Sequence, residues 1–260
     1  MLEADFRRVC IACDRFYPGR MNQEHFWRRW LIDRTGTHRT GVKWLGKKVS
    51  PRRTTVSICE SCNSEFGREI ETPVSALFTE LEAGRGLNDR EAELLVRWMW
   101  KFEGFAWKLN HRDAVYSTKC TLRDRVLNPI DKLRGDIVLA VGLIATIDPD
   151  YGDAPMGIDS DCEHNALFVS GVFSRIAMMV VLENFTSIVP RQFSKYRLAT
   201  KRIPPESDAK LFFPATCFAT CTDAVGVTFT CSARLREAHD AWAEPCRAAA
   251  GPDYAGGRLT

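Results

Sequence analysis

The decisive stretch of this chain reads CIAC at residues 10–13, EHFWRRWL at 24–31 and CESCN at 59–63. Structural zinc sites are tetrahedral, and two Cys-x-x-Cys turns supply four thiolates from two separate backbone knuckles. The spacing therefore predicts a structural Zn²⁺ held by Cys10, Cys13, Cys59 and Cys62. Four thiolates leave no open position for water, so this zinc would hold the frame and do no chemistry. A redox pair is the alternative, but neither motif opens a helix in a thioredoxin-like context.

Glu24 and His25 lie between the two cysteine turns, and Asn63 follows the last cysteine directly. If the zinc holds the strand before Asn63 against the segment around Glu24, the three side chains converge. A neutral imidazole can take a proton from water near pH 7. Carboxylate and amide oxygens suit a hard cation such as Mg²⁺. These residues predict a second, catalytic metal site, although an acid–histidine pair considered alone usually has no catalytic role.

Positive charge is concentrated between Arg20 and Arg53, where ten Lys and Arg residues stand against two acidic ones. The whole chain carries a formal net charge of only +3. Lys and Arg neutralise phosphates without reading base sequence, so this segment fits backbone-directed nucleic-acid binding; a solvated charged loop is the alternative. The predicted contacts are Arg28, Arg29, Arg39, Lys43, Lys47, Lys48, Arg52 and Arg53.

The order Cys-x-x-Cys, Glu-His-x-x-x-x-Trp-Leu, Cys-x-x-Cys-Asn and then a glutamate resembles HNH endonucleases with the ββα-metal fold, over residues 8–71. The segment 87–108, with Trp98 and Lys101, is similar, more loosely, to a helix that commonly follows in this group. The resemblance implies that Glu24 and Asn63 bind a catalytic divalent cation and that His25 is the general base that activates water.

Two positions depart from that family pattern. Arg28 or Arg29 stands near a place where the family often has proline, and Gly67 stands where many HNH sites have a further His or Asn. Glu71 lies one more turn along the same helix face, and we expect it to contribute to the catalytic metal site directly or through water.

The activity implied by the resemblance is hydrolysis of DNA phosphodiester bonds, with double-stranded DNA as the partner and Mg²⁺ or Mn²⁺ as the catalytic cofactor beside the structural Zn²⁺. Phage defence or mobile-element biology is the setting that the resemblance suggests. Two alternatives stay open: a non-catalytic zinc-ribbon nucleic-acid-binding protein, and a nuclease effector gated by its C-terminal part. That part could also bind a protein partner or a second copy of the chain.

The hydrophobic pattern predicts an α+β fold with three regions: a zinc-stapled HNH domain at 1–84, an α+β accessory domain at 85–246 and a flexible tail at 247–260. Alternating or buried apolar runs predict strands at 54–58, 137–147, 166–173 and 225–231, while 175–184 fits a helix or a strand. Apolar residues at helical spacing predict a helix after Cys62, with a kink or break at Pro73, and another from Asn88 to Leu109.

Composition bounds the class of protein. The chain has 260 residues, 45% hydrophobic and 27% charged, as in ordinary globular proteins. The N-terminus lacks an apolar core of signal-peptide length, and no apolar run approaches the eighteen or so residues that a membrane span needs. We therefore expect a soluble cytoplasmic protein whose paired cysteines bind metal and do not form disulfides.

Overall fold

Two antiparallel strands, β1 (Asn22–His25) and β4 (Thr55–Ile58), carry the first of the predicted site residues. The computed structural model of the protein describes residues 8–44, 47–110, 120–146, 156–160, 168–204 and 209–250. Across the strand pair His25 faces Thr55 and Glu24 faces Val56. The chain between them forms α1 (Arg29–Thr35), α2 (Thr37–Thr40) and the hairpin of β2 (Val42–Trp44) with β3 (Lys47–Val49).

One long helical segment follows β4 and passes through three forms: α3 (Glu60–Phe66), a π turn η2 (Gly67–Glu71) and α4 (Thr72–Glu82). Pro73 lies at the start of α4 and has no amide hydrogen to give to the preceding turn. A wider π turn before Pro73 accommodates the proline, so the helix continues where a kink or break was expected. Glu71 is the last residue of that turn.

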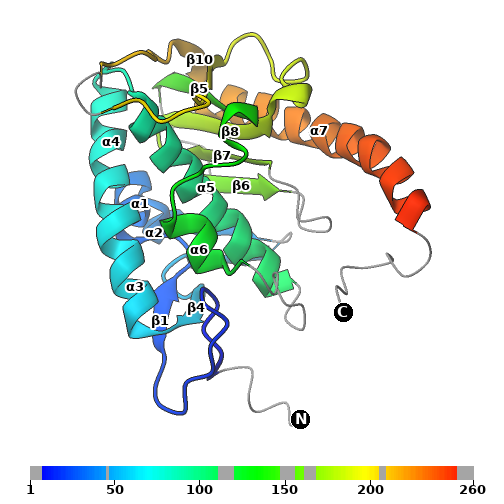
Figure 1. The fold of residues 1–260 in the computed structure, drawn as a ribbon. Coiled ribbons are helices and arrows are strands. Elements are labelled where there is room, and N and C mark those ends of the chain that lie inside the picture. The colour runs from blue at the N-terminus through cyan, green and yellow to red at the C-terminus, as the bar shows by residue number, and fades with distance from the viewer. Residues whose placement is uncertain are drawn as a thin grey trace.

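Helix α5 (Asp89–Asn110) is the central element of the structure. It begins with the predicted capping box, in which Asn88 and Glu91 each accept the other's backbone N–H at 2.8 Å. It packs against α4 and α6 (Leu122–Leu127) on one side and against β6 (Met156–Ser160) and β7 (Val169–Phe173) on the other (Figure 1). Its buried position explains its aromatic content.

A six-stranded sheet occupies the C-terminal half, in the order β10-β5-β8-β7-β6, with β9 also paired to β5. Alternate residues of β5 enter two different cores: Leu139 and Val141 face the α5 side, and Val138 and Ala140 face α7 (Cys221–Ala250). The strands are β5 (Ile137–Thr146), β6 (Met156–Ser160), β7 (Val169–Phe173), β8 (Ile176–Leu182), β9 (Ser194–Arg197) and β10 (Thr216–Thr220). Short 3-10 turns lie at Arg134–Asp136 and Glu183–Phe185.

Helix α7 (Cys221–Ala250) covers the other face of the sheet and corrects one sequence prediction (Figure 1). The strand predicted at 225–231 is wrong, because these residues lie inside α7, where the buried positions Ala224, Thr228 and Cys231 are spaced three to four residues apart, as on one face of a helix. The tail predicted at 247–260 overlaps the end of α7, and residues 251–260 lie outside the described part. The segment 175–184, left open between helix and strand, contains β8.

The α+β class is confirmed by this architecture. One hydrophobic core cluster contains Ile58 and Phe66 from the predicted first domain and Phe102 and Phe173 from the predicted second. The division at residues 84 and 85 stays a prediction. In the described ranges, every helix is too short or too polar to cross a membrane.

Candidate functional site

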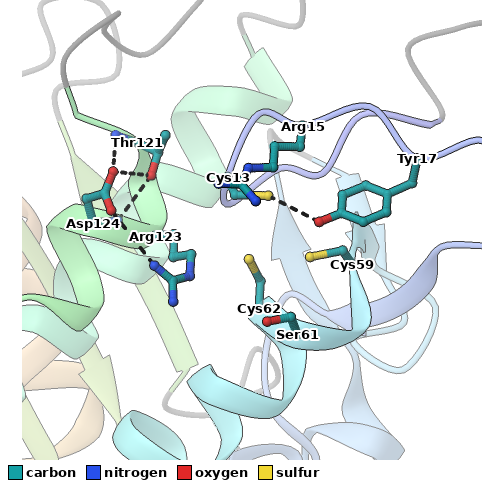
Figure 2. Close-up of a pocket in the computed structure, with 9 residues that line it drawn as sticks. All are labelled: Cys13, Arg15, Tyr17, Cys59, Ser61, Cys62, Thr121, Arg123 and Asp124. Atoms are coloured by element: carbon teal, nitrogen blue, oxygen red, sulfur yellow. Dashed lines mark hydrogen bonds and ion pairs between the residues drawn. The ribbon is translucent and has the colours of Figure 1, made fainter.

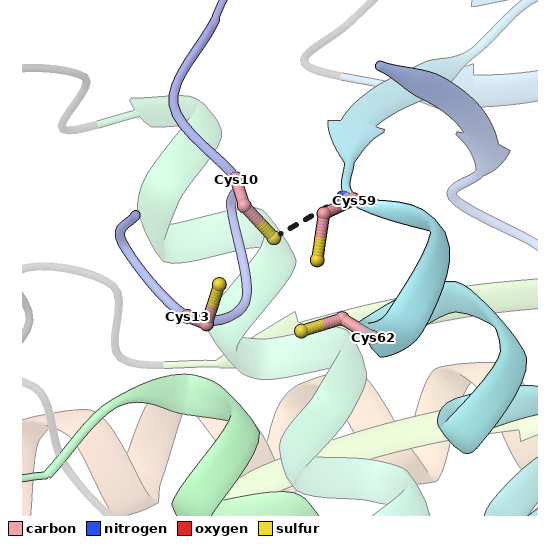
Figure 3. A group of neighbouring side chains, drawn as sticks. All are labelled: Cys10, Cys13, Cys59 and Cys62. Atoms are coloured by element: carbon pink, nitrogen blue, oxygen red, sulfur yellow. Dashed lines mark hydrogen bonds between the residues drawn. The ribbon is translucent and has the colours of Figure 1, made fainter. Parts of the chain in front are cut away.

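The four predicted zinc ligands come together at the start of the chain. The sulfur atoms of Cys10, Cys13, Cys59 and Cys62 all lie within 4.8 Å of one another (Figure 3). Cys10 and Cys13 come from a knuckle closed by the bridge between Val9 and Phe16, whereas Cys59 and Cys62 lie at the first turn of α3. The tertiary structure thus joins two sequence motifs 49 residues apart.

Backbone geometry supports the thiolates. The Cys59 amide donates to the Cys10 sulfur at 3.3 Å, an interaction that favours the ionised thiol. The pKa of Cys10 is lowered to about 5, first by its hydrogen bond with Cys62, while the same pairing raises the pKa of Cys62. Four sulfur donors at this separation fit one tetrahedral zinc ion, whose charge would offset the repulsion of four thiolates.

A pocket of about 240 Å³ opens beside this cysteine cluster (Figure 2). One wall is the N-terminus of α6, where Thr121 and Asp124 form a capping box. Arg123, which lines the pocket, forms an ion pair with Glu65 of α3 at 2.7 Å. The lining residues are Cys13, Arg15, Tyr17, Cys59, Ser61, Cys62, Thr121, Arg123 and Asp124. Three of the four cysteines belong to this lining, so the pocket is the solvent-facing side of the cysteine cluster.

Two buried carboxylates, Glu24 and Glu71, form a second cluster, called here the acidic cluster. Glu24 of β1 and Glu71 of η2 are each only 3% exposed. Successive side chains of a strand point to opposite faces, so Glu24 points inward while His25 is half-buried on the other side. The sequence predicted that Glu24 and Glu71 belong to one site, and the structure places both against the same lysine.

That lysine is Lys101, from the middle of α5. Its ammonium forms a hydrogen-bonded ion pair with Glu71 and lies 3.4 Å from Glu24 Oε1. Arg28 supplies a second cation: its Nε lies 2.5 Å from Glu24 Oε1 and 3.8 Å from Glu71 Oε1. The Arg28 Nε–H is not aligned as a hydrogen bond, so the contact with Glu24 is an ion pair.

Polar contacts complete the acidic cluster. Arg28 Nη2 donates to Asn63 Oδ1 at 3.3 Å and to its carbonyl at 3.4 Å. Trp30 and Trp98 donate their indole N–H groups to Glu71 Oε2 at 2.9 and 3.3 Å. Arg28 therefore contacts Glu24, Asn63 and Glu71, which are three of the predicted catalytic-site residues.

These carboxylates do not fit a divalent cation in the arrangement described. Magnesium requires free oxygen ligands in near-octahedral geometry. Glu24 Oε1 and Glu71 Oε1 each contact Lys101 and Arg28, Glu71 Oε2 accepts two indole N–H groups, and Asn63 Oδ1 accepts from Arg28. Two positive charges already balance the two negative ones. A metal ion held by protein side chains alone needs three or more Cys, His, Asp or Glu side chains close together. Among the described residues, the group that meets this condition is the cysteine cluster.

Gly67, the departure from the family pattern, lies beside Arg28. A Cβ atom built on Gly67 would lie 3.7 Å from Arg28 Nη2. The guanidinium thus occupies the space toward which a side chain at residue 67 would extend.

The predicted nucleic-acid contacts divide into two groups. Arg28 is directed into the acidic cluster, whereas Arg29 and Arg52 are exposed and both pair with Asp33. Arg39, Lys48 and Arg53 are also exposed. Lys43 and Lys47 lie on β2 and β3, and their side chains lie outside the described part of the structure.

Sequence reasoning assigned no role to Lys101 and did not place Arg28 inside the cluster. Lys101 could have been noticed, because it stands between aromatic residues on the buried side of a helix and a buried lysine requires an acidic partner. Its identity as the partner of Glu71 depends on packing between α5 and η2, which local sequence does not encode.

Comparison of the chain with models of protein families, with curated proteins and with solved structures finds no match. The residues described above are therefore the basis for assigning a function.

Proposed function

We propose that the protein is an HNH-type endonuclease that hydrolyses phosphodiester bonds of DNA. One arrangement supports the proposal: β4 pairs with β1 and runs into α3, so that Glu24 of β1 and Asn63 of α3 contact the same arginine, Arg28. A pair of strands with a following helix fits the ββα pattern that the resemblance implies, with α1, α2 and the β2–β3 hairpin inserted between the two strands. The cysteine cluster beside it fits structural zinc.

In this proposal, His25 is the general base that takes a proton from the attacking water. Arg28 can contact a phosphate because its guanidinium matches the geometry of phosphate oxygens. The exposed residues Arg29, Arg39, Lys48, Arg52 and Arg53 contact the backbone of double-stranded DNA. The resemblance implies Mg²⁺ or Mn²⁺, but we assign no step to it, since Arg28 and Lys101 already neutralise the carboxylates. The proposal also includes action in the cytoplasm, in phage defence or mobile-element biology.

Incubation of the purified protein with supercoiled plasmid tests this activity. We expect nicking with Mg²⁺ or Mn²⁺, and a loss of at least about 100-fold in rate for His25→Ala, as for removal of a general base. His38→Ala is the matched control, because His38 is exposed on α2, and it should keep the full rate. Absence of nicking with both metals, or equal rates for His25→Ala and the unmodified protein, would exclude the proposal.

A second candidate is a non-catalytic DNA-binding protein with a structural zinc. The observation that favours it is the charge balance of the acidic cluster, in which Arg28 and Lys101 already contact Glu24 Oε1 and Glu71 Oε1. It predicts binding of a labelled duplex, weakened by salt and by the double substitution Arg52→Ala/Arg53→Ala, without cleavage under any metal. Fluorescence anisotropy and the plasmid assay on the same preparation separate the two functions.

A further inference from the structure

The Glu24–Glu71 pair is neutralised by two side chains of the protein itself. Lys101 is 1% exposed, and its ammonium lies 5.1 to 5.9 Å from the ring centres of Phe66, Phe102 and Phe105. Arg28 is 20% exposed and lies at the outer side of the pair, next to Gly67. Both carboxylate side chains are 4% exposed, so their charges are weakly screened by solvent.

A divalent cation entering this cluster would meet opposition from both basic groups. It would be repelled at short range by two positive charges in a site with little water. It would also have to replace the ion pairs and the Arg28–Asn63 hydrogen bond that now use the oxygens. A divalent ion therefore needs one of the two basic side chains to be withdrawn.

We propose that Arg28 and Lys101 act as internal cations that exclude divalent metal ions from the Glu24–Glu71 pair in the free protein. Once the Arg28 side chain moves away from the two carboxylates, a divalent ion can bind them. This inference deepens the proposed function, on which it rests, by assigning a regulation to the same site: a DNA phosphate is the anion that can compete for Arg28.

Arg28 is the removable partner for three reasons. It is the more exposed of the two cations. Its hydrogen bonds to Asn63 are long, at 3.3 and 3.4 Å, and its contact with Glu24 is not an aligned hydrogen bond. Withdrawal of Arg28 frees Asn63 Oδ1, leaves Glu24 Oε1 with Lys101 as its remaining cationic contact, and leaves one uncompensated negative charge, which favours a cation.

Titration of the zinc-loaded, full-length protein with Mn²⁺, followed by electron paramagnetic resonance, tests the inference without any DNA. We expect no tight Mn²⁺ site in the unmodified protein. Arg28→Gln, which removes the charge and keeps an amide near Asn63, should raise Mn²⁺ affinity at least about tenfold. Arg28→Met provides a second neutral variant, and thermal unfolding shows that each variant is folded.

Two controls define the cause. Arg28→Lys keeps the positive charge and should continue to exclude Mn²⁺. Arg29→Gln removes the same charge from the neighbouring residue, whose side chain is 83% exposed, and should leave Mn²⁺ affinity unchanged. A tight Mn²⁺ site in the unmodified protein, no gain in either neutral Arg28 variant, or an equal gain in Arg29→Gln would overturn the inference.

The result is separable from the nuclease assay. If the free protein excludes Mn²⁺ but never nicks plasmid DNA, this inference stands and the proposed activity is wrong. If the protein nicks DNA but binds Mn²⁺ tightly in its free form, the proposed activity stands and this inference is wrong.

Discussion

The cysteine cluster and the acidic cluster solve the same electrostatic problem in opposite ways. Cys10, Cys13, Cys59 and Cys62 place four like donors within 4.8 Å of one another, and tetrahedral zinc is the cation that this donor set fits. Glu24 and Glu71 also place like charges together, but Lys101 and Arg28 stand between them. The first cluster fits an ion from solution, and the second carries its own cations. Proximity of potential ligands therefore does not by itself indicate a metal site.

The largest expected effect follows from removing the zinc that the cysteine cluster fits. Structural zinc is worth on the order of 10 kcal/mol in small domains, so Cys59→Ser should cause loss of the metal and a large fall in unfolding temperature. Metal analysis and thermal unfolding measure both. Cys120→Ser is the matched control, because Cys120 is exposed and lies outside the cluster. Unchanged zinc content in Cys59→Ser would show that the cluster does not bind zinc as described.

The second-largest effect on the free energy of unfolding is expected from Lys101→Met in the acidic cluster. This change leaves two buried carboxylates with Arg28 alone, and breaking a buried ion pair typically costs about 3–5 kcal/mol. Urea unfolding should show that loss. The double variant Lys101→Met/Glu71→Gln removes one charge of each sign and should recover part of it. Purely additive losses in this double-mutant cycle would indicate that Lys101 and Glu71 are not coupled.

A smaller effect is expected from Trp30→Phe. Trp30 donates to Glu71 Oε2 at 2.9 Å, and a hydrogen bond to a charged group contributes about 1.5–3 kcal/mol. The substitution keeps an aromatic ring against Phe78 and Trp98. Urea unfolding should show a loss in this range, and a smaller one when Glu71→Gln is already present. An equal loss in both backgrounds would assign the effect to packing and not to the hydrogen bond.

The smallest expected effect concerns the pocket wall beside the cysteine cluster. Thr121→Ala removes the cap of α6 and should cost about 1 kcal/mol with no loss of zinc. The pKa of Asp124 is lowered, first by its hydrogen bond from Thr121. This stabilisation is therefore present above the ordinary pKa of the carboxyl and is lost as pH falls through the lowered value. Urea unfolding at pH 7 and in acid should show a smaller cost of Thr121→Ala in acid; loss of zinc at neutral pH would contradict the separation of cap and metal site.

Local patterns predicted several elements with nearly correct bounds. The β-branched run before Cys59 predicted β4, and the capping residues Asn88 and Glu91 marked the start of α5. The strand predicted at 225–231 was wrong, because a short apolar run fits a strand or a buried helix equally well and only its position over the sheet decides.

The sequence by itself determined the cysteine cluster, because the chemistry of thiolates and the Cys-x-x-Cys spacing leave few alternatives. It also placed Glu24, Asn63 and Glu71 in one expected site. Only the tertiary structure decided what neutralises that site: Lys101 is 77 residues from Glu24 in the chain and reaches it through the packing of α5. The reason is physical. A charged residue can pair with many oppositely charged ones, and the fold selects which of them are buried together.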